Sequence, residues 1–255
     1  MDIITLDELK VIADERNFNI VLLEKDYLLT LLLYYIKDIK GLHFKGGTAL
    51  NKIYLDHQRL SEDLDFSLTI GIKNAEKQIR DKLKGTFFKK ITHDNRYDKF
   101  VRLIVHYNLF HDDGTIYIDL NEKQNTTIKP NTVNMFHFYK NNLPEFKVDC
   151  LEISEMTAEK IRATCQRYKP RDYYDLYYII KKRLPVDLKL VSEKFKEYNT
   201  DFDSSLIFKN TNKIFRDWND DLFNLTKSKL EFEEMINTLK KYFEYKDNKT
   251  HKKLK

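Results

Sequence analysis

Residues that could handle a metal ion and a phosphate occur close together between positions 42 and 68 of this 255-residue chain. Asp63 and Asp65 stand two apart in a strand-like segment, so their side chains share one face of that strand. The intervening Leu64 then points into the core. Two carboxylates fixed side by side repel each other, and the arrangement becomes favourable when a divalent cation lies between them and a substrate phosphate.

A glycine pair supplies the second half of this pattern. Gly46 and Gly47 close a short apolar run and precede the hydroxyl of Thr48 at the start of a helix-like segment. Glycine allows a positive φ and a close approach of the backbone to a ligand, so the turn could direct N–H groups at an anion. Alone, a glycine pair is usually a turn and Asp-x-Asp is usually solvated surface. In this order, the two motifs favour phosphoryl or nucleotidyl transfer.

The pattern resembles the nucleotidyltransferase toxins of the AbiEii family, known from type IV toxin–antitoxin and abortive-infection systems. The matching residues are Gly46, Gly47, Thr48, Arg59, Ser61, Asp63, Leu64, Asp65 and Phe66. The wider polymerase-β-like nucleotidyltransferase superfamily shares the glycine pair and the Asp-x-Asp more loosely. Thr48 stands where many relatives have Ser, which keeps the hydroxyl.

A second match lies on two predicted helices, one starting near Ser154 and one after Pro170. The resemblance implies that Lys160 is the family's functional lysine and Asp172 its functional aspartate. Physically, Lys160 is a point charge suited to a triphosphate, and Asp172 could orient that lysine or accept a proton from an incoming hydroxyl. The alternative is an ordinary helix ion pair. Arg171 and Asp175 complete the family motif, and the resemblance covers residues 42–180.

Asp119 is an acid inside the otherwise apolar strand-like segment 115–120. An acid is costly to bury without a partner. In a sheet beside Asp63 and Asp65, it would complete a three-carboxylate metal cluster, and the superfamily does use a third acid on a later strand. The alternative is an edge-strand acid that faces water.

Composition narrows the class of protein without deciding its function. Hydrophobic residues make up 42% of the chain and the net charge is +5, which permits but does not require a nucleic-acid partner. Cys150 and Cys165 have no partner at metal-ligand spacing and suit small buried positions in a reducing compartment. The longest apolar run, 27–36, is too short to span a bilayer. Met1 is followed by acids rather than by a basic segment, so we expect a cytoplasmic protein.

Periodicity predicts an α+β fold with flanking N-terminal helices and a C-terminal helical lobe, and the resemblance implies that the strands form a nucleotidyltransferase-type mixed sheet. Helices are expected over 5–15, 20–39, 73–83, 154–167, 170–185, 186–198, 203–224 and 229–245, and strands over 63–66, 100–110, 115–120, 133–138 and 146–153. We expect a core over 1–150, a helical lobe over 151–245 that contributes the lysine and aspartate motif, and a basic, disordered tail over 246–255.

The sequence therefore predicts metal-dependent nucleotidyl transfer from an NTP, with Mg²⁺ or Mn²⁺ as the ion. By resemblance, the protein would be a growth-inhibiting toxin that modifies an RNA, with tRNA as the expected acceptor, and its antitoxin would be a separately encoded DNA-binding protein. Two alternatives stay open. One is a phosphotransferase or nucleotidyltransferase acting on a protein or small-molecule hydroxyl, and the other is a catalytically idle module that binds a nucleotide or partner.

Overall fold

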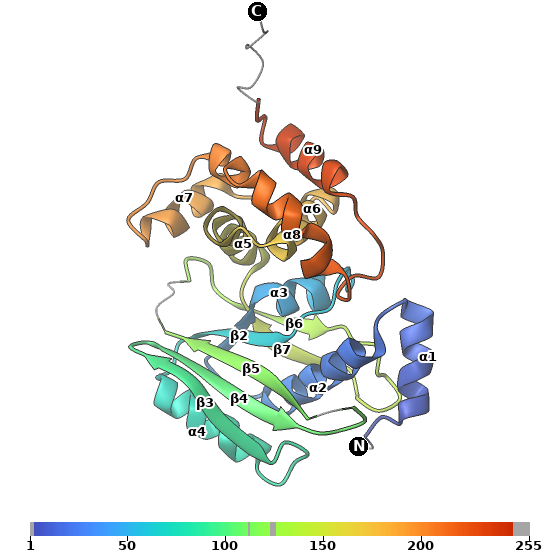
Figure 1. Cartoon of the computed structure of the whole chain (residues 1–255). Helices are drawn as coiled ribbons and strands as arrows, with labels where there is room; N and C mark the ends of the chain where they lie inside the picture. The colour runs from blue at the N-terminus through green and yellow to red at the C-terminus, as the bar shows by residue number, and fades with distance from the viewer. Residues whose placement is uncertain (1–2, 112, 123–125, 247–255) are drawn as a thin grey trace, which may run out of the picture. The chain divides into compact units, whose positions relative to one another are not determined.

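The computed structural model describes residues 3–111, 113–122 and 126–246, and the chain forms two compact units (Figure 1). Unit 1 comprises Met1–Met156 and Phe223–Ser228, and unit 2 comprises Thr157–Leu222 and Lys229–Lys255. Residues 247–255, which make up nearly all of the predicted basic tail, lie outside the described part. The segment Phe223–Ser228 belongs to unit 1 although it lies far along the chain. One contact that holds it there is the main-chain hydrogen bond that Leu225 accepts from Leu60 at 2.8 Å.

Unit 1 is built on one mixed sheet, whose strand order over the described residues is β3-β4-β5-β2-β1-β7-β6. The pairs β2–β5 and β1–β7 are parallel, and the other neighbouring strands are antiparallel. The predicted mixed sheet is confirmed. The strands are β1 (Leu42–Lys45), β2 (Asp63–Leu68), β3 (Lys90–Tyr97), β4 (Phe100–Tyr107), β5 (Gly114–Asn121), β6 (Asn131–Met135) and β7 (Phe146–Cys150).

Side chains alternate between the two faces of the central strands. Leu64 and Phe66 on β2 are buried, as are Ile118 and Leu120 on the adjacent β5. On the apolar side, α4 (Ile72–Leu83) packs against β5, and α2 (Ile20–Ile36) packs against α4. The opposite face of β2 and β5 carries half-buried acids, so burial of the apolar face fixes the direction in which these acids point.

The N-terminal helices of unit 1 begin where the sequence predicts. Thr5 caps α1 (Leu6–Arg16) in a capping box with Glu8, and Asn19 caps α2 through its side chain. The α2 helix ends at Ile36, three residues before the predicted end. After the glycine pair, the short helix α3 (Gly46–Ala49) continues into a π-helical turn, η1 (Leu50–Tyr54).

Unit 2 is helical, and α5 (Ile153–Arg167) leads into it from unit 1. Pro170 is the first residue of α6, where its missing N–H costs nothing. The remaining elements are α6 (Pro170–Lys181), α7 (Leu188–Lys196), η2 (Ser204–Phe208), α8 (Thr211–Leu222) and α9 (Phe232–Tyr242). The helix α6 packs against both α8 and α9.

Three sequence-based predictions differ from the structure. The strand β3 is not among the predicted strands, because its charged side chains hide the alternation of an edge strand. The single helix predicted over 203–224 is a 3₁₀ turn followed by α8. Tyr168 has a φ of 50° and ends α5, so it does not continue the predicted apolar stripe.

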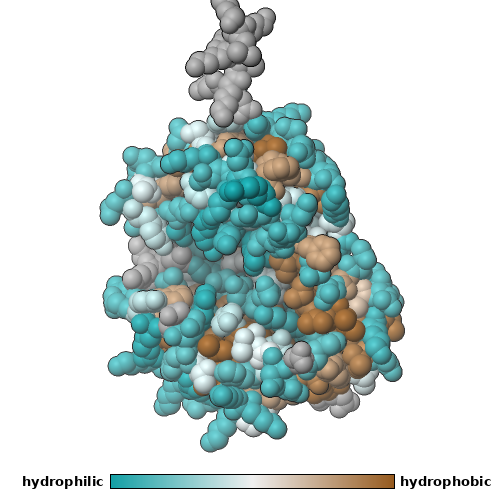
Figure 2. Space-filling model, in the orientation of Figure 1, coloured by the Kyte–Doolittle hydropathy of each residue, from teal (hydrophilic) through white to brown (hydrophobic). Residues whose placement is uncertain are grey.

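The surface is mostly hydrophilic on the face shown in Figure 2, as a chain with a mean hydropathy of −0.60 requires. Hydrophobic residues gather where Figure 1 places α1, and exposed Val11 and Val21 lie on α1 and α2. Cys150 and Cys165 are both buried and unbridged, as predicted. Within the described ranges, none of the helices combines the length and the apolar character that a membrane span needs.

Candidate active site

The turn between β1 and α3 brings the glycine pair next to the acids of β2. Gly46 has a φ of +79°, which an L side chain rarely adopts. A Cβ built on Gly46 would overlap the carboxylate of Asp65, so a side chain there is excluded both by backbone conformation and by space. Lys45 lies opposite Asp65 in the β1–β2 register. The turn and the acid strand are therefore fitted to each other.

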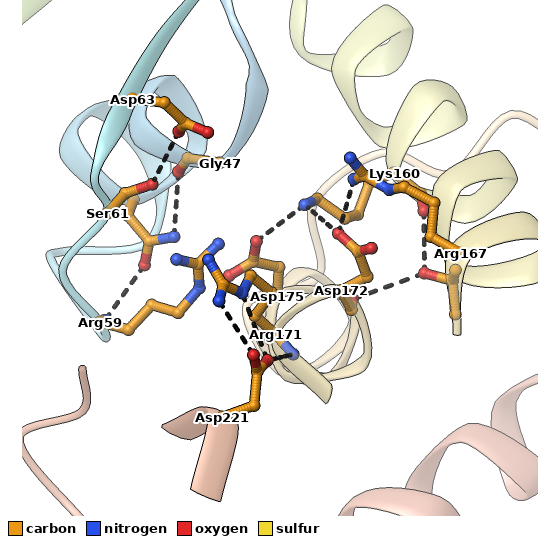
Figure 3. Close-up of polar contacts among 12 residues, drawn as sticks. Gly47, Arg59, Ser61, Asp63, Lys160, Arg167, Arg171, Asp172, Asp175 and Asp221 are labelled. Carbon is orange, nitrogen blue, oxygen red and sulfur yellow. Dashed lines mark hydrogen bonds and ion pairs between the residues drawn. The ribbon is translucent and has the colours of Figure 1, made fainter. Parts of the chain in front are cut away.

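A buried hydrogen-bond chain holds the other side of this turn (Figure 3). The side chain of Asn51 donates to the main-chain oxygen of Gly47 at 3.1 Å and accepts from the main-chain N–H of Arg59 at 3.2 Å. Arg59 is 2% exposed, and its Nη1 donates to the carbonyl of Leu60 at 2.9 Å. Arg59 thus braces the glycine turn, which gives this motif residue a positioning role.

Two hydroxyl groups lie next to Asp63. Thr48 Oγ1 donates to the main-chain oxygen of Asp63 at 2.5 Å, and Ser61 Oγ donates to its Oδ1 at 3.4 Å. The Thr48 hydroxyl therefore ties α3 to β2. That Thr48 and Ser61 also contact a nucleotide phosphate stays a prediction.

Asp63 and Asp65 are half-buried on the same face of β2, as their spacing predicts. Among the described residues, no group of three or more His, Cys, Asp or Glu side chains is arranged to hold a metal ion. Mg²⁺ usually needs only one or two protein carboxylates, because waters and substrate phosphates complete its shell. The pair of Asp63 and Asp65 therefore fits a Mg²⁺ ion that is shared with a nucleotide.

Asp119 lies directly beside Asp65 in the parallel β2–β5 register. Its carboxylate does not face water as an edge-strand acid would, because Arg102 on β4 binds both of its oxygens at 2.7 Å. These hydrogen bonds raise the pKa of Arg102 above its ordinary value, against the effect of burial, and the charge of Asp63 adds to the rise. That Asp119 is a metal ligand stays a prediction.

The predicted lysine and aspartate motif forms a buried ionic cluster inside unit 2 (Figure 3). Lys160 Nζ lies 2.9 Å from Asp172 Oδ1 and 2.9 Å from Asp175 Oδ2. These three side chains are 6%, 2% and 0% exposed, so the cluster is not the exposed ion pair that was the alternative interpretation. Thr164 supports it by donating to the main-chain oxygen of Lys160 at 2.8 Å.

One atom of this cluster has spare bonding capacity. Oδ1 of Asp172 accepts from Lys160 and, at 3.0 Å, from Arg167, whose side chain is 61% exposed. Oδ2 of Asp172 is buried and finds no hydrogen-bond partner in the part of the chain that the structure describes. A buried acceptor without a partner is costly, and a catalytic role or a bound water or ion is among the explanations for such an atom.

Arg171 precedes Asp172 in the motif but pairs with an acid of another helix. Its main-chain N–H, Nε and Nη2 all donate to Asp221 of α8, at 3.1, 3.2 and 2.9 Å. Burial raises the pKa of Asp221, but the hydrogen bonds and charge of Arg171 outweigh it and hold that pKa below its usual value. Arg171 therefore fastens α6 to α8 within unit 2.

Two cations of the acid site were missed from the sequence. Lys45 directly precedes the glycine pair, and this position could have identified it from the sequence as a cation of the site. Arg102 lies on a strand whose register with β5 no local pattern reveals, so its pairing with Asp119 could not be read from spacing.

Solved structures share this architecture. MenT4, a nucleotidyltransferase toxin from Mycobacterium tuberculosis H37Rv, matches with a TM-score of 0.66 at 18% identity, over 92% of this chain and 88% of that chain. JHP933 from Helicobacter pylori matches with a TM-score of 0.62 at 20% identity, over 89% of this chain and 92% of that chain. At these identities the likeness establishes the nucleotidyltransferase fold.

The family follows from the sequence itself. Residues 32–247 match the family model described as nucleotidyl transferase AbiEii toxin, type IV TA system. This match spans most of the chain, so the protein belongs to the AbiEii nucleotidyltransferase toxin family and is a nucleotidyltransferase of a toxin–antitoxin system. No curated protein sequence matches the chain. The resemblance drawn from the two motifs is confirmed.

Proposed function

We propose that this toxin transfers a nucleoside monophosphate from an NTP to a hydroxyl of an RNA acceptor, with tRNA as the expected acceptor, in a Mg²⁺-dependent reaction. The observation that carries the proposal is the pair of carboxylates on β2 packed against the glycine turn at the end of β1. In the reaction, the acceptor oxygen forms a bond to the α-phosphorus and pyrophosphate leaves. Such chemistry depends mainly on positioning and charge neutralisation.

The glycine turn would hold the triphosphate. Gly46 and Gly47 let the backbone turn tightly against the side chains of Asp65 and Arg59, and Thr48 and Ser61 place hydroxyls beside Asp63. Arg59 keeps the turn in place through Asn51. These residues would fix the nucleotide next to the acids.

Asp63 and Asp65 would hold the metal ion. When bound, Mg²⁺ neutralises phosphate charge and polarises the phosphoryl oxygens. Because the two carboxylates are fixed on a strand with a buried opposite face, they are pre-organised for the ion. The family implies an NTP substrate, and a divalent ion usually accompanies it.

Lys160 and Asp172 would serve the acceptor and the phosphates. Lys160 would neutralise phosphate charge, and Asp172 would orient that lysine or accept the proton of the incoming hydroxyl. Arg171 and Asp175 would keep this pair in position, through Asp221 and through Lys160 respectively.

The toxin–antitoxin family implies a separate antitoxin. We propose that this antitoxin is a DNA-binding protein encoded by its own gene, and that the toxin acts in the cytoplasm, where NTPs and tRNA are abundant.

The decisive experiment incubates the protein with each labelled NTP and purified tRNA, with total RNA and no-RNA reactions in parallel. We expect label on tRNA from one preferred NTP, and loss of label with EDTA. Asp65→Ala should lower the transfer rate by at least about 10²-fold, because removing a metal ligand removes several kcal/mol of transition-state stabilisation. Asp81→Ala, which changes an exposed acid on α4, is the matched control and should keep full activity.

The alternatives have distinct outcomes. Label on a protein or a small molecule, with none on any RNA, would indicate a transferase acting on a different hydroxyl. A protein that labels nothing, and whose effect on growth survives Asp63→Ala, would be a binding module.

A further inference from the structure

Arg102 and Asp119 form a two-pronged ion pair inside the proposed active site. Nε of Arg102 donates to Oδ1 of Asp119 and Nη2 donates to Oδ2, both at 2.7 Å. The Arg102 side chain is 33% exposed and that of Asp119 is 13% exposed. Paired, parallel N–H···O bonds of this kind are among the strongest hydrogen bonds in proteins, and their geometry is specific.

The pair lies in the same row as the metal-binding acids. Asp65 on β2 is in register with Asp119 on β5, which is in register with Arg102 on β4. Residues paired in this way point to the same face of a sheet, about 5 Å from one strand to the next. The guanidinium therefore belongs to the charged surface that carries Asp63 and Asp65.

The position of Arg102 is fixed from a second direction. Its guanidinium carbon lies 5.1 Å from the ring centroid of Tyr117, a neighbour of Asp119 on the same face of β5. Asp119 takes two of the five N–H donors of the guanidinium. The other donors have no acceptor in Asp119 and can serve a phosphate oxygen.

A metal ion at Asp119 would have to share this carboxylate with a guanidinium that already binds both of its oxygens. Both carboxylate oxygens are engaged, and arginine stays charged at any pH at which the protein is folded. The described residues also contain no three-acid metal group, although Asp63, Asp65 and Asp119 lie on adjacent strands. The acids present thus fit one ion between Asp63 and Asp65 and do not fit a second ion at Asp119.

We propose that Asp119 is a positioning residue for Arg102 rather than a metal ligand, and that the Arg102 guanidinium provides the second positive charge beside a single divalent ion. Two-metal enzymes use a pair of ions to neutralise the attacking and leaving oxygens. Here an arginine takes one of these places, as arginines do in other phosphoryl-transfer sites. This inference rests on the proposed nucleotidyl transfer.

Mn²⁺ binding to the purified protein, followed by electron paramagnetic resonance, tests the proposal without a measurement of turnover. Wild type should bind one Mn²⁺, and Asp65→Asn should weaken that binding at least tenfold, which shows that the signal reports the site. Asp119→Asn should leave the dissociation constant within about twofold, because Asp119 contacts Arg102 and not the ion. Arg102→Gln should expose Asp119, so that a second Mn²⁺ binds or the first binds at least tenfold more tightly.

The double variant Arg102→Gln/Asp119→Asn shows whether the tighter Mn²⁺ binding of Arg102→Gln comes from a freed Asp119 or only from the loss of a positive charge. If Arg102→Gln acts by freeing Asp119, then Asp119→Asn added to Arg102→Gln should abolish the gain, although Asp119→Asn alone does little. Arg96→Gln is the matched control. Arg96 lies on the edge strand β3 and also pairs with an acid, Glu76 of α4. This variant should not change Mn²⁺ binding. Thermal unfolding of each variant identifies any that fail to fold.

Four results would contradict the inference. A wild type that binds two Mn²⁺ ions, or an Asp119→Asn variant that loses Mn²⁺ at least tenfold, makes Asp119 a metal ligand while leaving nucleotidyl transfer intact. A wild type that binds no Mn²⁺ but labels RNA contradicts the single-ion site alone. A wild type that neither binds Mn²⁺ nor labels RNA contradicts the proposed function as well.

Discussion

Lys52 in unit 1 and Lys160 in unit 2 are both buried against aspartates, yet their surroundings differ. Lys52 Nζ donates to Asp26 at 2.6 Å and to Thr30 at 3.0 Å, and Tyr139 donates to the other Asp26 oxygen at 2.9 Å. Every oxygen of that carboxylate is therefore used. In the Lys160 cluster, Oδ2 of Asp172 lacks a hydrogen-bond partner among the described residues.

The charges of the two clusters differ as well. Lys52 faces one carboxylate, whereas Lys160 lies 2.9 Å from each of two. Burial lowers the pKa of Lys52, and the neighbouring Asp26 opposes that shift. Lys52 and Asp26 balance each other's charge, and both oxygens of Asp26 already accept hydrogen bonds. We therefore assign Lys52 a role in stability. In the Lys160 cluster, Oδ2 of Asp172 has no hydrogen-bond partner among the described residues, which favours a functional role for Lys160.

The largest expected effect is on stability, at the closed pair. Lys52→Met would leave Asp26 charged and buried, and should lower the free energy of unfolding by about 3–5 kcal/mol. Urea unfolding measures this directly. Transfer activity per folded molecule should stay at the wild-type level, and a variant as stable as wild type would contradict the assignment of Lys52.

Lys160→Met should instead act mainly on catalysis. Loss of a charge that stabilises the transition state typically lowers the rate by about 10²–10³-fold. Stability should fall as well, because the buried Asp172 and Asp175 both lose the lysine, although Arg167 still donates to Asp172. Initial rates with saturating NTP, together with urea unfolding of the same sample, test both statements. Full activity in this variant would erase the distinction between the two lysines.

The pH dependence of stability reports on the burial of His57, which lies near Lys52. Its ring is 4% exposed and lies 4.3 Å from the ring of Phe138, and burial, with the charge of Lys52, lowers the pKa of His57 to about 3. An unfolded histidine titrates near pH ~6.5, so between these values the unfolded state binds an extra proton. The free energy of unfolding should therefore fall as the pH drops below about 6.5, by up to about 1.4 kcal/mol per pH unit.

Urea unfolding at a series of pH values measures this slope, and His57→Leu should flatten it. An unchanged slope in His57→Leu would assign the pH dependence to other groups.

The smallest effect is expected at an exposed lysine of unit 2. Lys181 lies 4.0 Å from Glu234, and the two side chains are 53% and 55% exposed. Lys181→Met should change the free energy of unfolding by less than about 0.5 kcal/mol, because solvent screens exposed pairs. A larger change would mean that burial is not what separates Lys160 from an ordinary surface lysine.

The sequence predicted those features that depend on local patterns. Thr5 as a helix cap, Pro170 as a helix start and the two faces of β2 all follow from the spacing and type of neighbouring residues. The candidate acids were found for the same reason, since Asp63 and Asp65 occupy a single strand.

Features that depend on strand register could not be predicted. The bonding of Asp119 to Arg102 needs the pairing of β4 with β5, and residues 17 positions apart carry no local signal for it. The edge strand β3 was missed because charged side chains suit an edge and mask its alternation. Burial of the Lys160 cluster was also missed, because a charged helix motif is usually exposed.

Gly46 has no side chain, and the carboxylate of Asp65 occupies the room that one would need. Every change at the first or second base of a glycine codon introduces a side chain or a stop. Cells that survive forced expression of this growth inhibitor should therefore carry inactivating point mutations at codon 46 more often than at the codons of exposed residues. The feature that lets the turn and the acid strand fit together also makes the toxin easy to silence by a single nucleotide change.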